Sequence, residues 1–420
     1  MRSVTLWRAL LGVQKTVIES IEFDEDEQIL VARVRPTRRA GSRCGRCQRR
    51  SPWYDRGEGR RRWRTLDLGT IPVYLEADAP RVNCRTHGPT VRAVPWARHA
   101  AGHTTVFDEQ VAWLATQCSK SAVTELMRIA WRTVGAIITR VWADVEKLHD
   151  RFAGLKRIGI DEISYKRGHR YLTVVVDHDS GRLVWAAPGR DKATLNLFFD
   201  ALGADRCAQI THVSADGADW IADVVAERAP NAVRCADPFH VVRWATDALD
   251  EVRRQAWNQA RGAVTQRRAR RASGHAKALK NARYALWKNP ENLTDRQQAK
   301  LAWVAKTDPR LHRAYLLKEG LRLIFQLPFK EAPEALETWI GWARRCRIPA
   351  FVDLQRRIVK HRASILAAIE HGLSNGRIES VNTKIRLITR VAFGFRSPDA
   401  LIALAMLNLG GHRPTLPGRK

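Results

Sequence analysis

Five strand-like runs between residues 157 and 237 constrain the fold of this 420-residue chain more than any other feature. The first three runs, 157–161, 170–177 and 183–187, follow one another closely, and a hairpin-turn signal joins the last two. Helical stretches then separate the fourth run, 209–216, and the fifth, 232–237. Strands joined by short turns pair antiparallel, whereas strands joined through helices favour parallel pairing. The pattern therefore predicts an α/β domain.

Aspartates end the first and fourth of these runs. Three paired strands followed by two strand–helix units is the order of an RNase H-like α/β domain, in which the first and fourth strands lie side by side. Asp161 and Asp216 are therefore expected to be neighbours. Glu379 offers a third carboxylate on a later helix, whereas Glu162 points to the opposite face of its strand from Asp161.

Converging carboxylates in a basic chain make chemical sense if divalent metal neutralises them. Two Mg²⁺ (or Mn²⁺) ions about 4 Å apart can activate an attacking oxygen and stabilise a leaving one in an in-line displacement. Asp and Glu provide the oxygen ligands that Mg²⁺ prefers. The alternative is that each acid is an isolated strand-end or salt-bridge residue.

The charge balance points to a polyanionic partner. The chain has 72 Lys and Arg against 43 Asp and Glu, a net charge of +29. Such an excess favours nucleic acid first and an anionic membrane second. The longest apolar runs, such as 400–407, fall short of the ~18 residues of a membrane helix. Seven cysteines are too few and odd in number for a secreted disulfide scaffold, so we expect a cytosolic nucleic-acid-binding protein.

Four potential metal ligands occur as two spaced pairs, Cys44/Cys47 and Cys84/His87. Two such pairs match the tetrahedral set that structural Zn²⁺ takes, although free thiols in a reducing compartment are the alternative. From residue 43 to 64 there are nine basic and two acidic residues, with Trp53 and Trp63 among them. This pattern suits phosphate contact with base stacking, or else a solvated charged face.

Residues 105–150 carry apolar positions at helical spacing and predict three helices. The second and third, 121–130 and 131–140, follow each other closely, as in a helix-turn-helix that places its later helix in a major groove. On that interpretation Arg132, Thr133 and Arg140 are the candidates for DNA contact. Any three-helix bundle gives a similar pattern.

A long basic helical stretch follows the strands. Between residues 253 and 288 there are eleven Arg or Lys and no acid. We interpret it as a surface that tracks the DNA backbone, with a solvated helix as the alternative. Its candidate DNA contacts are Arg253, Arg254, Arg267, Arg268, Arg270 and Arg271.

Four runs together resemble one known family, the DDE transposases of the bacterial ISL-three insertion-sequence family. They are Ile158 to Glu162, Lys166 to Asp177, Asp237 to Val242 and Ser374 to Asn382. The cysteine–histidine pairs and the helices after them resemble that family's N-terminal zinc finger and helix-turn-helix. The resemblance covers nearly the whole chain.

The resemblance implies a DDE triad of Asp161, Asp216 and Glu379. It also implies a motif of Asp237 and His240, in which His240 helps to position the DNA strand or the scissile phosphate. The competing possibility is that Asp237, and not Asp216, is the second catalytic acid.

The implied fold class is α/β, an RNase H-like catalytic domain with an all-α insertion, preceded by a small zinc-binding domain and a helix-turn-helix domain. The expected boundaries are 1–104 for the zinc-binding domain, 105–150 for the helix-turn-helix, 151–240 and 373–410 for the two catalytic parts, 241–372 for the insertion and 411–420 for a flexible tail.

The implied function is metal-dependent cleavage and strand transfer at the terminal inverted repeats of a bacterial insertion sequence. The expected partners are terminal and target DNA and a second copy of the chain, with no membrane, in the cytoplasm near the nucleoid. The rivals are a zinc-finger and helix-turn-helix regulator without catalysis, and an RNase H-like nuclease without strand transfer.

Overall fold

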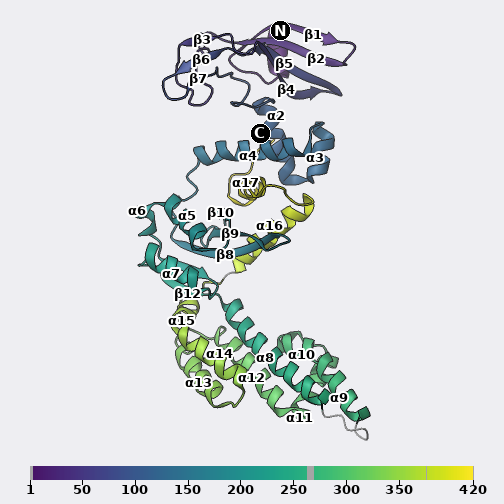
Figure 1. The fold of residues 1–420 in the computed structure, drawn as a ribbon, viewed down its shortest axis with the longest axis vertical. Helices are drawn as coiled ribbons and strands as arrows, with labels where there is room; N and C mark the ends of the chain where they lie inside the picture. Colours follow the sequence, from purple (N-terminus) through teal and green to yellow (C-terminus); the bar gives the residue numbers. More distant parts are fainter. Residues whose placement is uncertain (1–2, 263–268, 375, 420) are drawn as a thin grey trace. The chain divides into compact units, whose positions relative to one another are not determined.

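The computed structural model describes residues 3–262, 269–374 and 376–419. The chain forms two compact units, one of residues 1–150 with 388–420 and one of residues 151–387. Within the described residues, no helix is both long and apolar enough to cross a membrane. Element labels follow Figure 1. The boundary between them falls inside one helix, so the expected six-part domain layout stays a prediction.

The first unit begins with two small sheets. A four-stranded sheet has the order β1-β2-β5-β4 and a three-stranded sheet has the order β3-β6-β7. Val73, Leu75 and Trp63 are buried in the core of the larger sheet. The elements are α1 (Ser3–Leu10), β1 (Thr16–Asp24), β2 (Ile29–Pro36), β3 (Trp53–Asp55), β4 (Arg60–Leu68), β5 (Ile71–Asp78), β6 (Arg81–Cys84) and β7 (Gly88–Val91).

Four helices complete this unit. They are α2 (Thr105–Gln117), α3 (Lys120–Met127), α4 (Trp131–Leu148) and α17 (Pro398–Leu409). The three helices expected over 105–150 are thereby confirmed. Thr104 and Ser119 cap α2 and α3 by accepting hydrogen bonds from Phe107 and Ala122 N–H, and Arg128 ends α3 in the left-handed region (φ 51°). The turn to α4 is therefore short, and α17 packs against α4 and α2.

The second unit is built on a five-stranded sheet with the order β10-β9-β8-β11-β12. The strands are β8 (Arg157–Lys166), β9 (Arg170–Asp177), β10 (Leu183–Pro188), β11 (His212–Ala215) and β12 (Val233–Ala236). The first three pair antiparallel, whereas β8, β11 and β12 pair parallel. The predicted α/β fold is confirmed, with the first and fourth strands adjacent as expected. The connecting helices α5 (Lys192–Leu202), α6 (Ala204–Cys207) and α7 (Asp219–Arg228) surround a core that includes Phe198 and Phe199.

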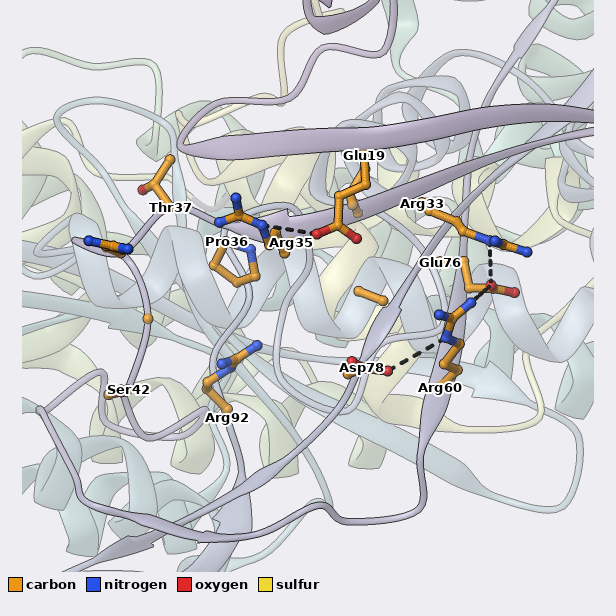
Figure 2. A pocket seen from close by; sticks show the side chains of 14 residues that line it. Glu19, Arg33, Arg35, Pro36, Thr37, Ser42, Arg60, Glu76, Asp78 and Arg92 are labelled. Carbon is orange, nitrogen blue, oxygen red and sulfur yellow. Dashed lines mark hydrogen bonds and ion pairs between the residues drawn. The ribbon is translucent and has the colours of Figure 1, made fainter.

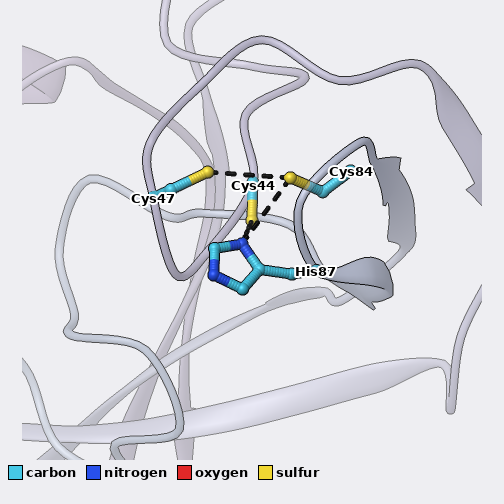
Figure 3. A group of neighbouring side chains, drawn as sticks. All are labelled: Cys44, Cys47, Cys84 and His87. Atoms are coloured by element: carbon cyan, nitrogen blue, oxygen red, sulfur yellow. Dashed lines mark hydrogen bonds between the residues drawn. The ribbon is translucent and has the colours of Figure 1, made fainter.

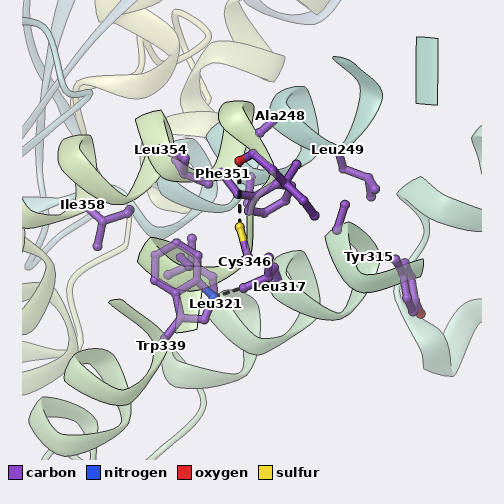
Figure 4. Packing of buried hydrophobic residues seen from close by; sticks show 14 of the residues in the cluster. Ala248, Leu249, Tyr315, Leu317, Leu321, Trp339, Cys346, Phe351, Leu354 and Ile358 are labelled. Carbon is purple, nitrogen blue, oxygen red and sulfur yellow. Dashed lines mark hydrogen bonds between the residues drawn. The ribbon is translucent and has the colours of Figure 1, made fainter. Parts of the chain in front are cut away.

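A helical insertion lies between β12 and the final helix of this unit. Its elements are α8 (Pro238–Gly262), α9 (Ala269–Asn281), α10 (Arg283–Trp287), a 3₁₀ turn (Pro290–Asn292), α11 (Asp295–Thr307), α12 (Pro309–Ile324), α13 (Ala332–Arg345), α14 (Pro349–Lys360) and α15 (Arg362–His371). Leu317, Trp339 and Phe351 are buried in its core, where Trp339 Nε1 donates to the Leu317 carbonyl over 2.8 Å (Figure 4). Helix α16 (Gly376–Val391) follows and returns to the sheet.

Candidate active site, metal centre and DNA interface

The four predicted zinc ligands converge in the first unit (Figure 3). The ligand atoms of Cys44, Cys47, Cys84 and His87 all lie within 4.8 Å of one another. Three of the separations, from Cys44 Sγ and from Cys84 Sγ to His87 Nδ1 and between Cys47 and Cys84 Sγ, are each 3.6 Å. A tetrahedron with bonds of about 2.0–2.3 Å has edges of roughly 3.5–3.8 Å, so the set fits zinc.

The local backbone prepares one of these thiols for metal. The pKa of Cys84 is lowered to about 5, first because the Thr86 backbone N–H donates to its sulfur and then because of His87. The thiolate is the form of cysteine that binds metal. Gly45 lies in the turn of the first pair, where a Cβ would come within 2.6 Å of the Val91 carbonyl oxygen. The four ligands close the set, which indicates a structural ion.

Strand register aligns three aspartates at one edge of the sheet. In the parallel pairing of β11 with β8, Ser214 lies opposite Gly159, so Asp216 comes level with Asp161 beyond the last pair. In the pairing of β11 with β12, Ala215 lies opposite Ala236, so Asp237 comes level with Asp216. Asp216 and Asp237 directly follow the carboxyl ends of β11 and β12, whereas β8 continues past Asp161 to Lys166, beyond the strand end expected at residue 161. Burial raises the pKa of Asp161, and the like charges of Asp216 and Asp237 add to this.

The motif after β12 is tied together internally. Asp237 is buried, and its Oδ2 lies 2.7 Å from His240 Nδ1. The hydrogen bond to Asp237 raises the pKa of His240, to which the charges of Asp216 and Asp161 also contribute. Asp216 is only partly buried and accepts a hydrogen bond from Ala218 N–H (2.9 Å). The imidazole therefore lies in the electrostatic field of all three aspartates.

Helix α16 lies over the same strand. Asn382 is 3% exposed, and its Nδ2 donates to Asp161 Oδ2 over 2.7 Å, while its Oδ1 is a buried acceptor without a partner in the described part of the chain. One turn earlier, Ile378 covers Gly159, where a Cβ would clash with Ile378 Cδ1 and lie 2.9 Å from His178 Nε2. Residues 378 and 382 of α16 thus contact residues 159 and 161 of β8, respectively.

Glu379 lies in the first turn of α16 and is exposed. Helical spacing places it on the same side of α16 as Asn382. Among the described residues, the cysteine–histidine cluster is the one group of three or more Cys, His, Asp or Glu whose ligand atoms all lie within 4.8 Å. No such group of described residues contains Asp161, Asp216 and Glu379, so the triad stays a prediction.

Glu162 is an acid that the sequence argument set aside. Its side chain is 6% exposed and pairs with Arg190 Nε at 3.4 Å. Burial raises the pKa of Glu162 to about 7, and the next largest cause is the negative charge of Asp216. Although strand alternation points Glu162 to the opposite face from Asp161, the negative charges of Asp216 and Asp161 still raise the pKa of its carboxyl group.

The predicted DNA contacts on α4 separate into two kinds. Arg132 is exposed and Thr133 is partly exposed. Arg140 instead pairs with Asp108, which is fully buried, through contacts of 2.9 Å and 3.0 Å. Arg98 reaches the same carboxylate at 3.3 Å. The Arg140 side chain therefore holds α4 against α2, and its expected contact with DNA stays a prediction.

The predicted basic surface of the insertion is partly internal. Arg253 is buried and pairs with Asp250 at 2.8 Å, which is not the exposed position that the surface interpretation assumes, and its contact with DNA stays a prediction. Arg254 is exposed and lies 3.4 Å from the same carboxylate. Arg267 and Arg268 lie outside the described residues, as do the side chains of Arg270 and Arg271.

The two tryptophans near the zinc ligands also differ. Trp53 is 65% exposed on β3, whereas Trp63 is 2% exposed and packs edge-to-face on Trp96 at a centroid distance of 5.6 Å. Trp63 is therefore a core residue, and the stacking interpretation applies to Trp53 alone of these two.

An arginine-lined pocket of about 440 Å³ lies beside the first sheet (Figure 2). Most of its charges are paired: Arg35 with Glu19 at 2.9 Å, and Arg60 with Glu76 at 3.2 Å and with Asp78 at 3.6 Å. Because its acids neutralise much of its positive charge, the pocket by itself does not indicate a DNA site.

Comparison with known families accounts for most of the chain. Residues 158–405 match a family model described as a transposase. Residues 92–142 match the helix-turn-helix domain of transposase family ISL3, and residues 40–87 match the zinc-finger of transposases IS204, IS1001, IS1096 and IS1165. These ranges contain the aspartate row with α16, helices α2 and α3 with most of α4, and the four zinc ligands.

Named relatives agree with the family models. The transposase for insertion sequence element IS1557 of Mycobacterium tuberculosis is 69% identical over 437 residues, which cover 100% of this chain and 98% of the relative. The transposase for insertion sequence element IS1001 of Bordetella parapertussis is 27% identical over 405 residues, which cover 94% and 95% of the two chains. Matched along its length and carrying all three modules, this chain belongs to the ISL3 family of insertion-sequence transposases.

Proposed function

We propose that this transposase cleaves and joins DNA at the edge of the sheet where Asp161 and Asp216 meet, with Glu379 as the third acid. The observation that carries the proposal is the register of three parallel strands, which brings acids from residues 161, 216 and 237 level with one another. A chain with a net charge of +29 keeps such a row beside bound DNA because metal binding neutralises it.

The residues fit Mg²⁺. The donors are carboxylate oxygens, and the buried Oδ1 of Asn382 is a further oxygen acceptor with no partner among the described residues. When bound, Mg²⁺ supplies charge stabilisation for an in-line displacement at phosphorus. Asp161, Asp216 and Glu379 are the residues that hold it.

The chain's own groups orient this site. Asn382 Nδ2 and the Glu162 backbone N–H each donate to Asp161, at 2.7 Å and 2.8 Å, which fixes the direction of its carboxylate. His240 is favoured in its charged form by Asp237 and attracts the DNA strand to the row of acids. In hydrolysis a water oxygen bonds to phosphorus as the P–O3′ bond breaks and the departing O3′ takes a proton. In joining, the new 3′-hydroxyl displaces the 3′-oxygen of a target phosphodiester and loses its own proton.

Asp216 is a better candidate than Asp237 for the second acid. Asp216 is partly exposed, whereas Asp237 is 2% exposed and bound to His240. Asp237 then acts as the residue that holds His240 and, by raising its pKa, favours the charged imidazole.

The first unit recognises the element ends. Arg132 and Thr133 of α4 contact DNA, and Zn²⁺ holds the strands around Cys44 and Cys84. In the second unit, Arg254 of α8 follows the DNA backbone. The chain acts on two ends at once, so it works as a dimer or larger assembly, in the cytoplasm where its DNA lies.

The test uses the purified chain, Mg²⁺ and a duplex that carries the terminal inverted repeat of the element. Asp161→Asn, Asp216→Asn and Glu379→Gln each abolish cleavage while end binding persists, whereas the control Asp179→Asn, at an exposed ion pair with Arg157, cleaves normally. Cleavage that survives the three substitutions contradicts the proposal. Failure of the chain to join a pre-nicked 3′-hydroxyl end to a plasmid reduces it to a nuclease.

A further inference from the structure

Gly217, directly after Asp216, lies against the helical insertion. A Cβ at this glycine would lie 2.6 Å from Trp244 Cζ2 and 3.8 Å from Arg357 Nη2. Any larger residue would displace the indole ring of Trp244, which comes from α8. The insertion therefore touches the chain at the residue that follows a proposed catalytic acid.

Arg357 lies flat against this tryptophan. Its guanidinium carbon is 3.7 Å from the centre of the Trp244 ring, a distance at which a cation–π interaction holds the side chain in place. Trp244 packs in turn on the buried core of the insertion. Arg357 as a residue is exposed, while the ring covers one side of its guanidinium and fixes its position.

The chain just after Arg357 is tied to the catalytic part of the unit. Lys360 Nζ lies 2.8 Å from Asp219 Oδ1, at the start of α7, and α15 packs on β12. The His361 ring lies 5.4 Å from the Trp244 ring. The guanidinium thus has a fixed place beside the aspartate row.

Arg357 has no ion pair within the described residues, unlike its neighbours on α14. Arg356 pairs with Asp353 at 2.8 Å, and Lys360 pairs with Asp219. Burial lowers the pKa of Arg357, and the negative charge of Asp216 is the largest opposing influence. A guanidinium that is positioned but unpaired, beside carboxylates that repel DNA, is suited to bind a phosphate.

We propose that Arg357, held on Trp244, is a DNA-phosphate contact that the insertion supplies to the active site, next to the scissile phosphodiester. The inference rests on the proposed function, because it takes the aspartate row as the place where DNA is cut. The contact orients the strand and offsets the charge that develops at phosphorus.

The experiment compares Arg357→Ala with Arg356→Ala on the same helix. Under single-turnover conditions with Mg²⁺ and the terminal-repeat duplex, Arg357→Ala lowers the cleavage rate by about 10- to 100-fold, as the loss of a positioned donor does. The affinity for the element end, which the first unit supplies, changes less than about threefold, or about 0.7 kcal/mol. Arg356→Ala cleaves like the unaltered chain.

Neutral phosphates identify the contact. Single methylphosphonates are placed one at a time around the cleavage position. The one at the contacted phosphate slows the unaltered chain as much as Arg357→Ala does, and it slows Arg357→Ala no further. Trp244→Phe keeps the core filled and gives an intermediate loss, because the ring still supports the guanidinium.

Equal cleavage by Arg357→Ala and the unaltered chain, or methylphosphonate effects that simply multiply with the substitution at every position, overturns the inference. Either result leaves the proposed function intact as long as Asp216→Asn is inactive. An active Asp216→Asn chain contradicts the proposed function instead.

Discussion

His178 illustrates how single residues fix the active sheet. It is 4% exposed, its Nε2 shares a 2.6 Å hydrogen bond with Ser214 Oγ, and Arg377 donates to its carbonyl. Burial, with the charges of Arg377 and Arg157, lowers the pKa of His178 to about 4. The imidazole is therefore neutral in the folded chain at neutral pH.

This pKa predicts a pH dependence of stability. An unfolded histidine has a pKa near 6.5, so between about pH 6.5 and pH 4 the unfolded chain takes up a proton that the folded chain excludes. The contribution of His178 to the free energy of unfolding therefore falls by about 2–3 kcal/mol over that window. Glu162, whose pKa is raised to about 7, contributes in the opposite direction as the pH falls. The prediction is therefore a difference between two chains: His178→Gln, which can still bond Ser214, gains stability relative to the unaltered chain as the pH falls from 6.5 to 4. Hydrogen exchange of β9 and β11, corrected for intrinsic rates, measures it, and equal slopes in both chains contradict the assignment.

Residue types and spacing were sufficient to find the zinc ligands and the aspartates, because ligand pairs and strand ends are local patterns. They did not reveal the ion pair of Arg140 with Asp108 or the burial of Trp63, because both residues look like exposed binding residues in the sequence. Asp108 lies 32 residues from Arg140 and Trp96 lies 33 residues from Trp63, so the buried partners that decide these roles are set by tertiary packing.

At the scale of elements, the contact of α16 with β8 decides where Glu379 lies. Ile378 fits over Gly159 because that residue has no side chain, and Asn382 then meets Asp161. The sequence predicts the strand order and the helix, but it does not show this contact, which joins residues 221 positions apart. Strand register likewise adds Asp237 to the row, because the pairing of β11 with β12 places it level with Asp216. The sequence of a single strand does not show this pairing.

Overpacking this contact should impair the reaction. Gly159→Ala forces Ile378 and His178 to move and costs about 1–3 kcal/mol. A displacement of about 1 Å at Glu379 can lower the cleavage rate by roughly 100-fold. Ile378→Ala in the same chain makes room for the new methyl group, so the double variant is more active than Gly159→Ala alone. Single-turnover cleavage measures this, and strictly multiplicative losses would show that the two residues do not pack together.

At the scale of the whole molecule, the end of the chain belongs with its beginning. Helix α17 packs on α4 and α2, with Leu401, Leu404 and Leu407 buried. Lys120 Nζ lies 4.7 Å from the Trp131 ring and 4.9 Å from the Phe395 ring, so the segment before α17 also contacts the helix-turn-helix. Sequence order predicts that residues 373–410 form the second catalytic part. In the structure, α17 instead packs on the apolar face of α4, in the first unit.

Removal of residues 398–420 should therefore weaken DNA binding, although this segment contains none of the proposed contacts. Loss of α17 exposes apolar residues of α4 and destabilises the unit that carries Arg132, with an expected loss of about tenfold or more in end affinity, or 1.4 kcal/mol. Removal of residues 414–420 alone is the control. Binding measured by fluorescence anisotropy decides the matter, and full affinity without α17 would show that α2 to α4 suffice.

The most direct test of the whole account exchanges one acid for a thiol. Mg²⁺ takes oxygen ligands, whereas Mn²⁺ accepts a thiolate more readily. Asp216→Cys is expected to be inactive with Mg²⁺ and to regain cleavage of the terminal-repeat duplex with Mn²⁺, while Asp237→Cys, level with it on the next strand, shows no such metal-specific rescue. Full activity of Asp216→Cys with Mg²⁺, or rescue of Asp237→Cys in its place, would contradict the assignment of Asp216 as a metal ligand.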